Sequence, residues 1–188
     1  MVLGAPLLAG YISEFCMYLS DSAMVGHLGT EYLAAMGIAV MVGEILWIII
    51  WPLAPATQSL ASQRYGRASI FKKRVSQEYR NLIVSTGDVF NNSLVFAFGA
   101  GIIAVLFANL CHPFLTLVMD DSSLIPHIEG YVSIVRWAMP VAGVFYALYG
   151  FLAGINKTIP IMIATIGLNV LNILFNYMLS LLQNSFHQ

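Results

Sequence analysis

Long runs of apolar residues, separated by short polar segments, dominate the sequence. Five runs are long enough, as helices, to cross a hydrocarbon core of about 30 Å. They cover residues 2–24, 33–61, 93–118, 128–153 and 159–182. The segments between them contain the polar, glycine and proline residues that interrupt helices. The pattern therefore predicts an all-α membrane protein with about five transmembrane helices, forming a single transmembrane domain over residues 1–188.

The composition also indicates a membrane protein. Hydrophobic residues make up 59% of the chain and charged residues 9%, and the mean hydropathy is +0.81, whereas about a quarter of the residues of a soluble domain are charged. A net charge of -1 provides no basic surface for nucleic acid, so we expect no nucleic-acid partner. Cys16 and Cys111 lie in apolar runs without the spacing of a zinc site or a disulfide framework, and we interpret them as packing residues.

The distribution of Lys and Arg predicts the orientation in the membrane. Six of the eight basic residues lie between the second and third apolar runs: Arg64, Arg67, Lys72, Lys73, Arg74 and Arg80. Lys157 falls on the same side if the helices alternate in direction. Because basic loops stay in the cytoplasm, we expect a cytoplasmic N-terminus in a plasma (inner) membrane. The first run has no basic segment before it and no cleavage site, so we expect it to remain in the membrane.

Ionisable residues within the apolar runs are candidates for function. Such a residue costs at least about 2.5 to 3.5 kcal/mol at the centre of a membrane helix, so it usually faces a cavity or a partner. Glu14 and Asp21 are seven residues apart and share one helix face. Glu44 and Arg136 lie deep in two other runs. The alternatives are an interfacial carboxylate at Asp21 and a structural ion pair between Glu44 and Arg136.

Helix geometry places three of these residues at one depth. Counting about 1.5 Å per residue from the outer boundary places Glu14, Glu44 and Arg136 at roughly 15, 16 and 13 Å. The first two runs are joined by a short turn, so their helices are expected to be antiparallel neighbours. We therefore predict an intramembrane charge cluster in which the two carboxylates share a proton or share Arg136 as a counter-ion.

The last apolar run carries a stripe of carboxamides. Asn169, Asn172 and Asn176 recur at positions i, i+3 and i+7, so their side chains lie along one side of the helix. Two interpretations are open: the stripe makes hydrogen bonds to neighbouring helices, or it lines a water-filled cavity.

Several segments together resemble one family of transporters. The first, 6–29, ends in Asp21-Ser-Ala-Met-Val-Gly-His-Leu-Gly29. The others are 33–35, 62–66, 150–154, 158–160 and 169–177, together with Tyr131 and Pro140. In this order they resemble the N-terminal part of the multidrug and toxin extrusion (MATE) transporters, and the similarity covers nearly the entire chain.

The resemblance implies a fold, an activity and a site. MATE transporters have twelve helices in two six-helix lobes and export cationic or amphipathic compounds in exchange for H⁺ or Na⁺. This chain would form most of the N-terminal lobe, with Asp21, Tyr131, Asn172 and Asn176 as the cation- or proton-binding residues. Na⁺ at Asp21 is the only metal ion implied, and no cofactor is. Asn176 stands where some members have Asp, which removes one titratable group from the site.

The chain departs from the family pattern because the sixth helix and the second lobe are absent. We expect a fragment, a non-transporting remnant, or a half-transporter that needs the missing lobe or another chain in order to move a drug-like small molecule across the lipid. A related flippase for lipid-linked sugars is an alternative, but it would need cations to hold a pyrophosphate, and only Arg136 is available. No HExxH or GxSxG motif occurs, so we do not expect an enzyme.

Overall fold

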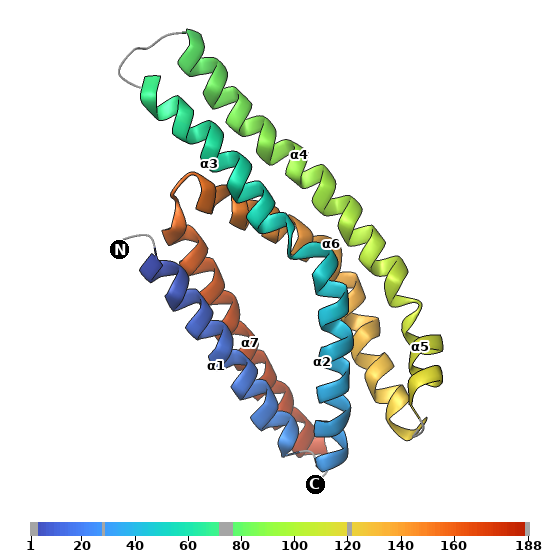
Figure 1. The fold of residues 1–188 in the computed structure, drawn as a ribbon. Helices are drawn as coiled ribbons and strands as arrows, with labels where there is room; N and C mark the ends of the chain where they lie inside the picture. Colours follow the sequence, from blue (N-terminus) through green and yellow to red (C-terminus); the bar gives the residue numbers. More distant parts are fainter. Residues whose placement is uncertain (1–3, 28, 72–76, 120–121, 187–188) are drawn as a thin grey trace. The chain divides into compact units, whose positions relative to one another are not determined.

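The computed structural model describes residues 4–27, 29–71, 77–119 and 122–186, and every element in these ranges is a helix (Figure 1). The elements are α1 (Gly4–Gly26), α2 (Thr30–Ile50), α3 (Leu53–Phe71), α4 (Gln77–Ala108), α5 (Cys111–Val118), the 3₁₀ helix η1 (Ser122–Leu124), α6 (Ile125–Gly154) and α7 (Thr158–Phe186). The predicted all-α fold is confirmed.

Four helical segments of the described residues are long and apolar enough to cross a membrane. They are Thr30–Ile70, Gln77–Ala108, Ser122–Gly154 and Thr158–Leu179. These segments overlap the last four predicted runs, which supports an integral membrane protein. Helix α1 has 23 residues, enough to span the bilayer, but it contains two acids and is not among the four. The fifth span therefore stays a prediction.

The chain divides into two compact units. The first contains residues 1–37 and 158–188, and the second contains residues 38–157. Each unit is described by itself below.

In the first unit, α1 packs along α7 (Figure 1). A Cβ atom built on Gly10 would lie 3.8 Å from Thr165 Cγ2. Further along both helices, Ser13 is hydrogen-bonded to Asn169 and Asp21 to Asn176. Since the partners advance together along the two helices, α1 and α7 are parallel. The N-terminal half of α7 thus lies beside the middle of α1, and the polar stripe of α7 follows the acidic side of α1.

In the second unit, α3, α4 and α6 pack against one another at small residues. A Cβ atom on Gly143 of α6 would lie 2.7 Å from the carbonyl oxygen of Ala97 in α4. One on Gly154 would lie 2.8 Å from the carbonyl oxygen of Gln58 in α3. Such contacts require glycine, because the backbones of membrane helices approach closely only where side chains are small. Helix α6 therefore packs directly against both α3 and α4.

The predicted run 33–61 is broken into α2 and α3 at Trp51 and Pro52. Pro52 and Pro55 both lack the N–H group that would continue the α2 hydrogen-bond ladder. The backbone instead makes a bond of 3.2 Å from Ala54 N to the Trp51 carbonyl oxygen and another from Ala56 N to the Pro52 carbonyl oxygen. Helix α3 starts anew from this turn.

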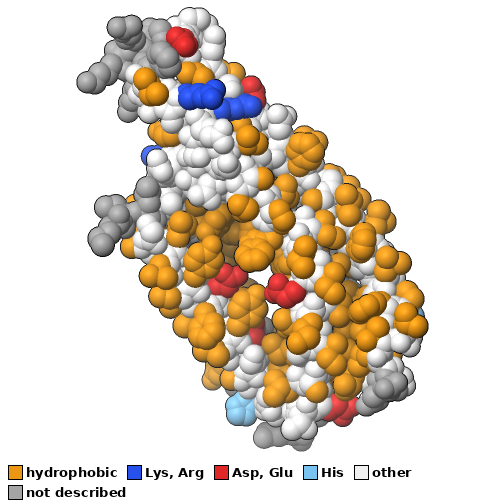
Figure 2. All heavy atoms as spheres, viewed as in Figure 1, with side chains coloured by type: hydrophobic (Ala, Val, Ile, Leu, Met, Phe, Trp, Pro, Cys, Tyr) orange, Lys and Arg blue, Asp and Glu red, His pale blue; other side chains and the backbone are white. Residues whose placement is uncertain are grey.

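The polar segment 64–92, which sequence analysis predicts between two spans, is helical where the structure describes it. Helix α3 continues to Phe71 and α4 begins at Gln77, whereas Lys72, Lys73 and Arg74 lie outside the described residues. With 32 residues, α4 is about 48 Å long, well beyond a hydrocarbon core of about 30 Å. Lys and Arg side chains gather at this end of the α3–α4 pair, where hydrophobic side chains become sparse (Figure 2). The pair therefore extends past the apolar layer.

Candidate functional site

Asp21 is hydrogen-bonded to a carboxamide of α7. The Asn176 side chain donates from Nδ2 to Asp21 Oδ1 at 2.8 Å and to Asn172 Oδ1 at 3.1 Å. Asn172 and Asn176 are one helical turn apart on α7, so Asn172 joins Asp21 through Asn176. All three side chains are half-buried. The structure thus brings together three of the four residues predicted for the cation or proton site.

The remaining carboxamide of the stripe makes a different contact. Asn169 is buried, with 8% of its surface exposed, and its Nδ2 donates to Ser13 Oγ at 3.0 Å. Here the interpretation as interhelical hydrogen bonding is confirmed, because both groups are neutral and join α1 to α7. At Asn176 the partner is a carboxylate, which changes the electrostatics of the contact.

The first unit has acids and no Lys or Arg. Its acidic residues are Glu14, Asp21 and Glu31, and residues 1–37 and 158–188 contain no basic residue other than histidine. A carboxylate in a membrane helix is expensive unless it is paired or protonated. The amide of Asn176 stabilises the charge of Asp21 but does not neutralise it. No Lys or Arg of this unit can therefore neutralise the charge of Asp21.

The chemistry of the ligands narrows the choice of cation. Among the described residues, no group of three or more His, Cys, Asp and Glu is placed to hold a metal ion. The oxygens near Asp21 come from one carboxylate and two carboxamides, and such hard oxygen ligands suit hard cations rather than transition metals. The arrangement can hold a proton or an alkali cation.

Tyr131, the fourth predicted site residue, belongs to the second unit. It lies on α6 and contacts α2, since a Cβ atom on Gly43 would lie 3.6 Å from Tyr131 Cε1. Its membership of the Asp21 network joins residues of two units and stays a prediction. The same holds for the predicted pairing of Glu14, in the first unit, with Glu44, in the second.

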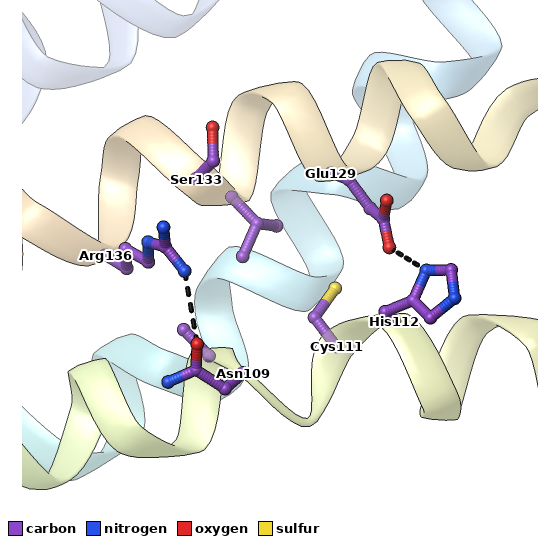
Figure 3. Close-up of a pocket in the computed structure, with 8 residues that line it drawn as sticks. Asn109, Cys111, His112, Glu129, Ser133 and Arg136 are labelled. Carbon is purple, nitrogen blue, oxygen red and sulfur yellow. Dashed lines mark hydrogen bonds and ion pairs between the residues drawn. The ribbon is translucent and has the colours of Figure 1, made fainter.

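Arg136 has a partner that sequence analysis did not predict. Its Nη1 donates to Asn109 Oδ1 at 3.2 Å (Figure 3), and within the described part of the chain it forms no ion pair with Glu44. It lines a cavity of 260 Å³ between α4, α5 and α6. The lining residues are Ala108, Asn109, Cys111, His112, Glu129, Val132, Ser133 and Arg136.

His112 and Glu129 form an ion pair across this cavity (Figure 3). The sequence contained no signal for this pair, because the two residues are 17 positions apart and meet only through the turn between α5 and α6. Arg136 and Asn109 are likewise joined over 27 positions. Hydropathy shows that Arg136 lies within an apolar run, but it does not show which residue accepts a hydrogen bond from its guanidinium.

Comparison with protein families gives a direct result. The model of the MatE family matches residues 6–178 of the chain. The chain belongs to the MatE family.

The relatives of this chain are named as multidrug resistance proteins or as a transporter. The chain is 24% identical over 166 residues to the probable multidrug resistance protein NorM of Xanthomonas axonopodis, a match that covers 88% of this chain and 33% of that protein. It is 26% identical to the NorM protein of Agrobacterium fabrum, covering 95% and 36%. An uncharacterized transporter of Schizosaccharomyces pombe is 27% identical, and this match covers 94% of this chain and 31% of the transporter. The MatE chain thus spans about a third of the length of these relatives. No solved structure matches it.

Membership of the MatE family agrees with the apolar helices. Both indicate an integral membrane protein of a transporter family rather than an enzyme. The resemblance noted in the sequence is confirmed, and the residues of the Asp21 network all lie within the matched range.

Proposed function

We propose that the MatE chain is part of a secondary antiporter that exports cationic or amphipathic compounds in exchange for H⁺ or Na⁺. Asp21, with Asn172 and Asn176, is the binding site of the coupling ion in this proposal. The observation that carries it is an acid of the largely apolar helix α1 whose side-chain partner is a neutral amide, in a unit without Lys or Arg.

The Asn176 amide offers a way to load and release the ion. Its Nδ2 donates to Asp21 Oδ1, which favours the charged carboxylate. Rotation of the Asn176 side-chain amide about its Cβ–Cγ bond would turn Oδ1 toward Asp21 in place of Nδ2, because Asn carries a donor and an acceptor on one planar group. The amide oxygen then accepts from a protonated Asp21 or joins the ligands of Na⁺. The two orientations correspond to the empty and the loaded site.

The proposed substrate class and setting follow from charge and family. A unit with acids and no Lys or Arg favours cationic substrates, and NorM relatives are named for multidrug resistance. Alternating access requires two bundles around a central site, so transport needs a second lobe or another chain. The basic residues of α3 and α4 favour a plasma (inner) membrane orientation with the N-terminus in the cytoplasm.

A chimera tests the proposal. The MatE chain replaces the matching third of the Pseudomonas putida NorM protein, and efflux of a cationic dye is measured in cells that lack their own exporters. We expect efflux from the chimera, loss of efflux in Asp21→Asn with unchanged membrane insertion, and normal efflux in Glu31→Gln. Glu31 is the matched control, since it is an exposed acid of the same unit. Undiminished efflux in Asp21→Asn rules out the role of Asp21.

The coupling ion is identified with the purified MatE chain. Saturable binding of radioactive Na⁺ that disappears in Asp21→Asn identifies Na⁺. Efflux by the chimera that follows the pH gradient and is indifferent to Na⁺ identifies H⁺. Dye efflux that needs neither gradient contradicts the antiport mechanism.

Two alternatives predict different results. A flippase for lipid-linked sugars requires basic groups that hold a pyrophosphate, and the first unit has no Lys or Arg. A non-transporting remnant is distinguished by expressing the MatE chain alone and together with the rest of a NorM protein. If dye efflux is absent in both experiments, the chain is a non-transporting remnant.

A further inference from the structure

We propose that the cavity between α4, α5 and α6 binds the phosphodiester group of a membrane phospholipid, with Arg136 as its principal ligand. This site lies in the second unit and is separate from the Asp21 network. The proposal rests on the hydrogen-bonding state of the guanidinium, on the position of Arg136 in a membrane helix, and on the charges that line the cavity.

The guanidinium of Arg136 has unused donors. Among the described residues, Asn109 is its hydrogen-bond partner, and Asn109 is neutral. The Nε atom is buried and has no partner in the described part of the chain. A guanidinium has five N–H groups in a planar fork that matches the two oxygens of a phosphate or carboxylate. An anion in the cavity would satisfy Nε and supply the missing counter-charge.

The position of Arg136 in α6 directs the guanidinium toward the end of the helix where the cavity lies. Arg136 is eleven residues after the start of α6 at Ile125, about 17 Å along the axis. Side chains of a helix tilt toward its N-terminus, so Arg136 reaches back toward Asn109, which directly follows the last residue of α4. Long basic side chains extend in this way toward the headgroup region of a bilayer, which shortens the distance to that region from the depth of roughly 13 Å expected for Arg136. The guanidinium carbon also lies 5.5 Å from the centre of the Trp137 ring, a cation–π contact that supplies no negative charge.

The acid of the cavity lining already has a partner other than Arg136. Glu129 and Arg136 lie on one face of α6 with Ser133 between them, and Glu129 is paired with His112 of α5 (Figure 3). Arg136 carries the permanent positive charge of the cavity lining, the sign that a phosphodiester, with its single negative charge, requires. The cavity volume of 260 Å³ is below the roughly 300–1,000 Å³ of pockets for drug-sized ligands, and suits a headgroup.

Binding of phosphatidylglycerol tests the site. The purified full chain in detergent receives increasing amounts of the lipid, and native mass spectrometry measures the affinity of the first bound lipid. We expect Arg136→Gln to weaken this affinity at least about tenfold, since hydrogen bonds to charged groups are strong. Arg80→Gln is the control. It removes an exposed basic residue near the N-terminal end of α4, whereas the cavity lies at the C-terminal end of that helix. This variant should leave the lipid affinity unchanged. Equal losses in both variants overturn the proposal.

A second pair of variants keeps the test valid if Arg136→Gln fails to fold. Asn109→Asp places an acid beside the guanidinium and competes with the phosphate, while preserving the contact with Arg136. Asn109→Ala removes the same hydrogen bond without adding charge. We expect a loss of at least about tenfold for Asn109→Asp and a clearly smaller loss for Asn109→Ala, which removes the Arg136 contact without adding a competing charge. Normal lipid binding by Asn109→Asp contradicts the proposal.

The source of the phosphate is tested separately. Glycerol 1-phosphate, which carries the anion without acyl chains, is added to the lipid-bound chain. A membrane lipid is supported if millimolar glycerol 1-phosphate does not displace phosphatidylglycerol. Displacement at concentrations comparable to those of the lipid overturns the lipid assignment in favour of a soluble phosphate ligand.

Discussion

The two units of the MatE chain hold their helices together by different means. In the first unit, α1 and α7 are joined by hydrogen bonds between polar side chains, Ser13 with Asn169 and Asp21 with Asn176. In the second, α6 meets α3 and α4 where glycines allow the backbones to touch, and a buried hydrogen bond between two neutral hydroxyls, Thr57 and Ser93, joins α3 to α4. The units also differ in charge: all eight Lys and Arg residues lie in the second. This difference agrees with the proposal that the coupling ion binds in the first unit.

The physical reason lies in what each contact does when it is disturbed. Packing between backbones has no alternative partner, and a displaced helix loses dispersion contacts outright. A carboxamide or hydroxyl can exchange one partner for another, which makes hydrogen bonds between membrane helices weak on average. Such exchangeable contacts suit residues that must bind and release an ion. We therefore expect substitutions in the second unit to affect stability most, and those in the first to affect function most.

The largest expected effect on stability is that of Gly150→Val in α6. A Cβ atom on Gly150 would lie 2.9 Å from the carbonyl carbon and the Cα of Ala54, both backbone atoms of α3. We expect the free energy of unfolding to fall by about 3 kcal/mol or more, since forced overpacking costs about 1–3 kcal/mol and sometimes more. Unfolding by sodium dodecyl sulfate, followed by circular dichroism, measures it.

Gly99→Val in α4 is the matched control, because nothing lies within 4 Å of a Cβ atom at Gly99. Its free energy of unfolding should stay within about 0.5 kcal/mol of the wild type. If both variants lose the same stability, close backbone packing is not what joins α3 to α6.

An intermediate effect is expected at the buried hydrogen bond between α3 and α4. Thr57 Oγ1 donates to Ser93 Oγ at 2.9 Å, and both residues are buried. Thr57→Val leaves the buried Ser93 hydroxyl without this partner, so we expect a loss of about 1 to 1.7 kcal/mol in the free energy of unfolding, the upper part of the range for hydrogen bonds between membrane helices. The double variant with Ser93→Ala should recover part of this loss, because neither polar group is then buried alone. Strictly additive losses would show that the two hydroxyls do not interact.

Hydropathy predicted the positions of the apolar helices because it reports which residues can lie in lipid. It did not predict where helices end. The segment 64–92 is polar, yet α3 and α4 continue through its described part, since a helix can leave the bilayer without unwinding. Prolines were equally ambiguous: Pro52 marks a break, whereas Pro140 remains inside α6, where it packs against Gly101.

The candidate site was predicted in part. The spacing of Asn172 and Asn176 indicated a polar face, and the resemblance to MATE transporters linked that face to Asp21. The structure supplies the contact between them, across 155 positions. The sequence predicted Arg136 as a counter-ion but did not predict its hydrogen bond to Asn109. The depth of a residue along a helix gives its level in the bilayer but not its direction around the helix axis.

The smallest expected effect is at Asn169, the neutral contact of the first unit. Asn169→Leu removes the hydrogen bond to Ser13 and replaces a buried amide by an apolar side chain of similar size. Ser13 can then bond to a carbonyl of its own helix. We therefore expect the free energy of unfolding to fall by about 0.6 kcal/mol and by less than about 1.7 kcal/mol, the range measured for hydrogen bonds between membrane helices. The same detergent titration used for Gly150→Val measures it.

Ser13→Ala serves as the partner variant for Asn169→Leu. Each single variant and the double variant should lose similar amounts of stability, because all three remove one and the same interaction. A loss at Asn169 as large as that of Gly150→Val would contradict the distinction between the two units. In that case the polar contacts of α1 and α7 would be structural, and the exchange of partners proposed for Asn176 would be opposed by a tightly held α1–α7 pair.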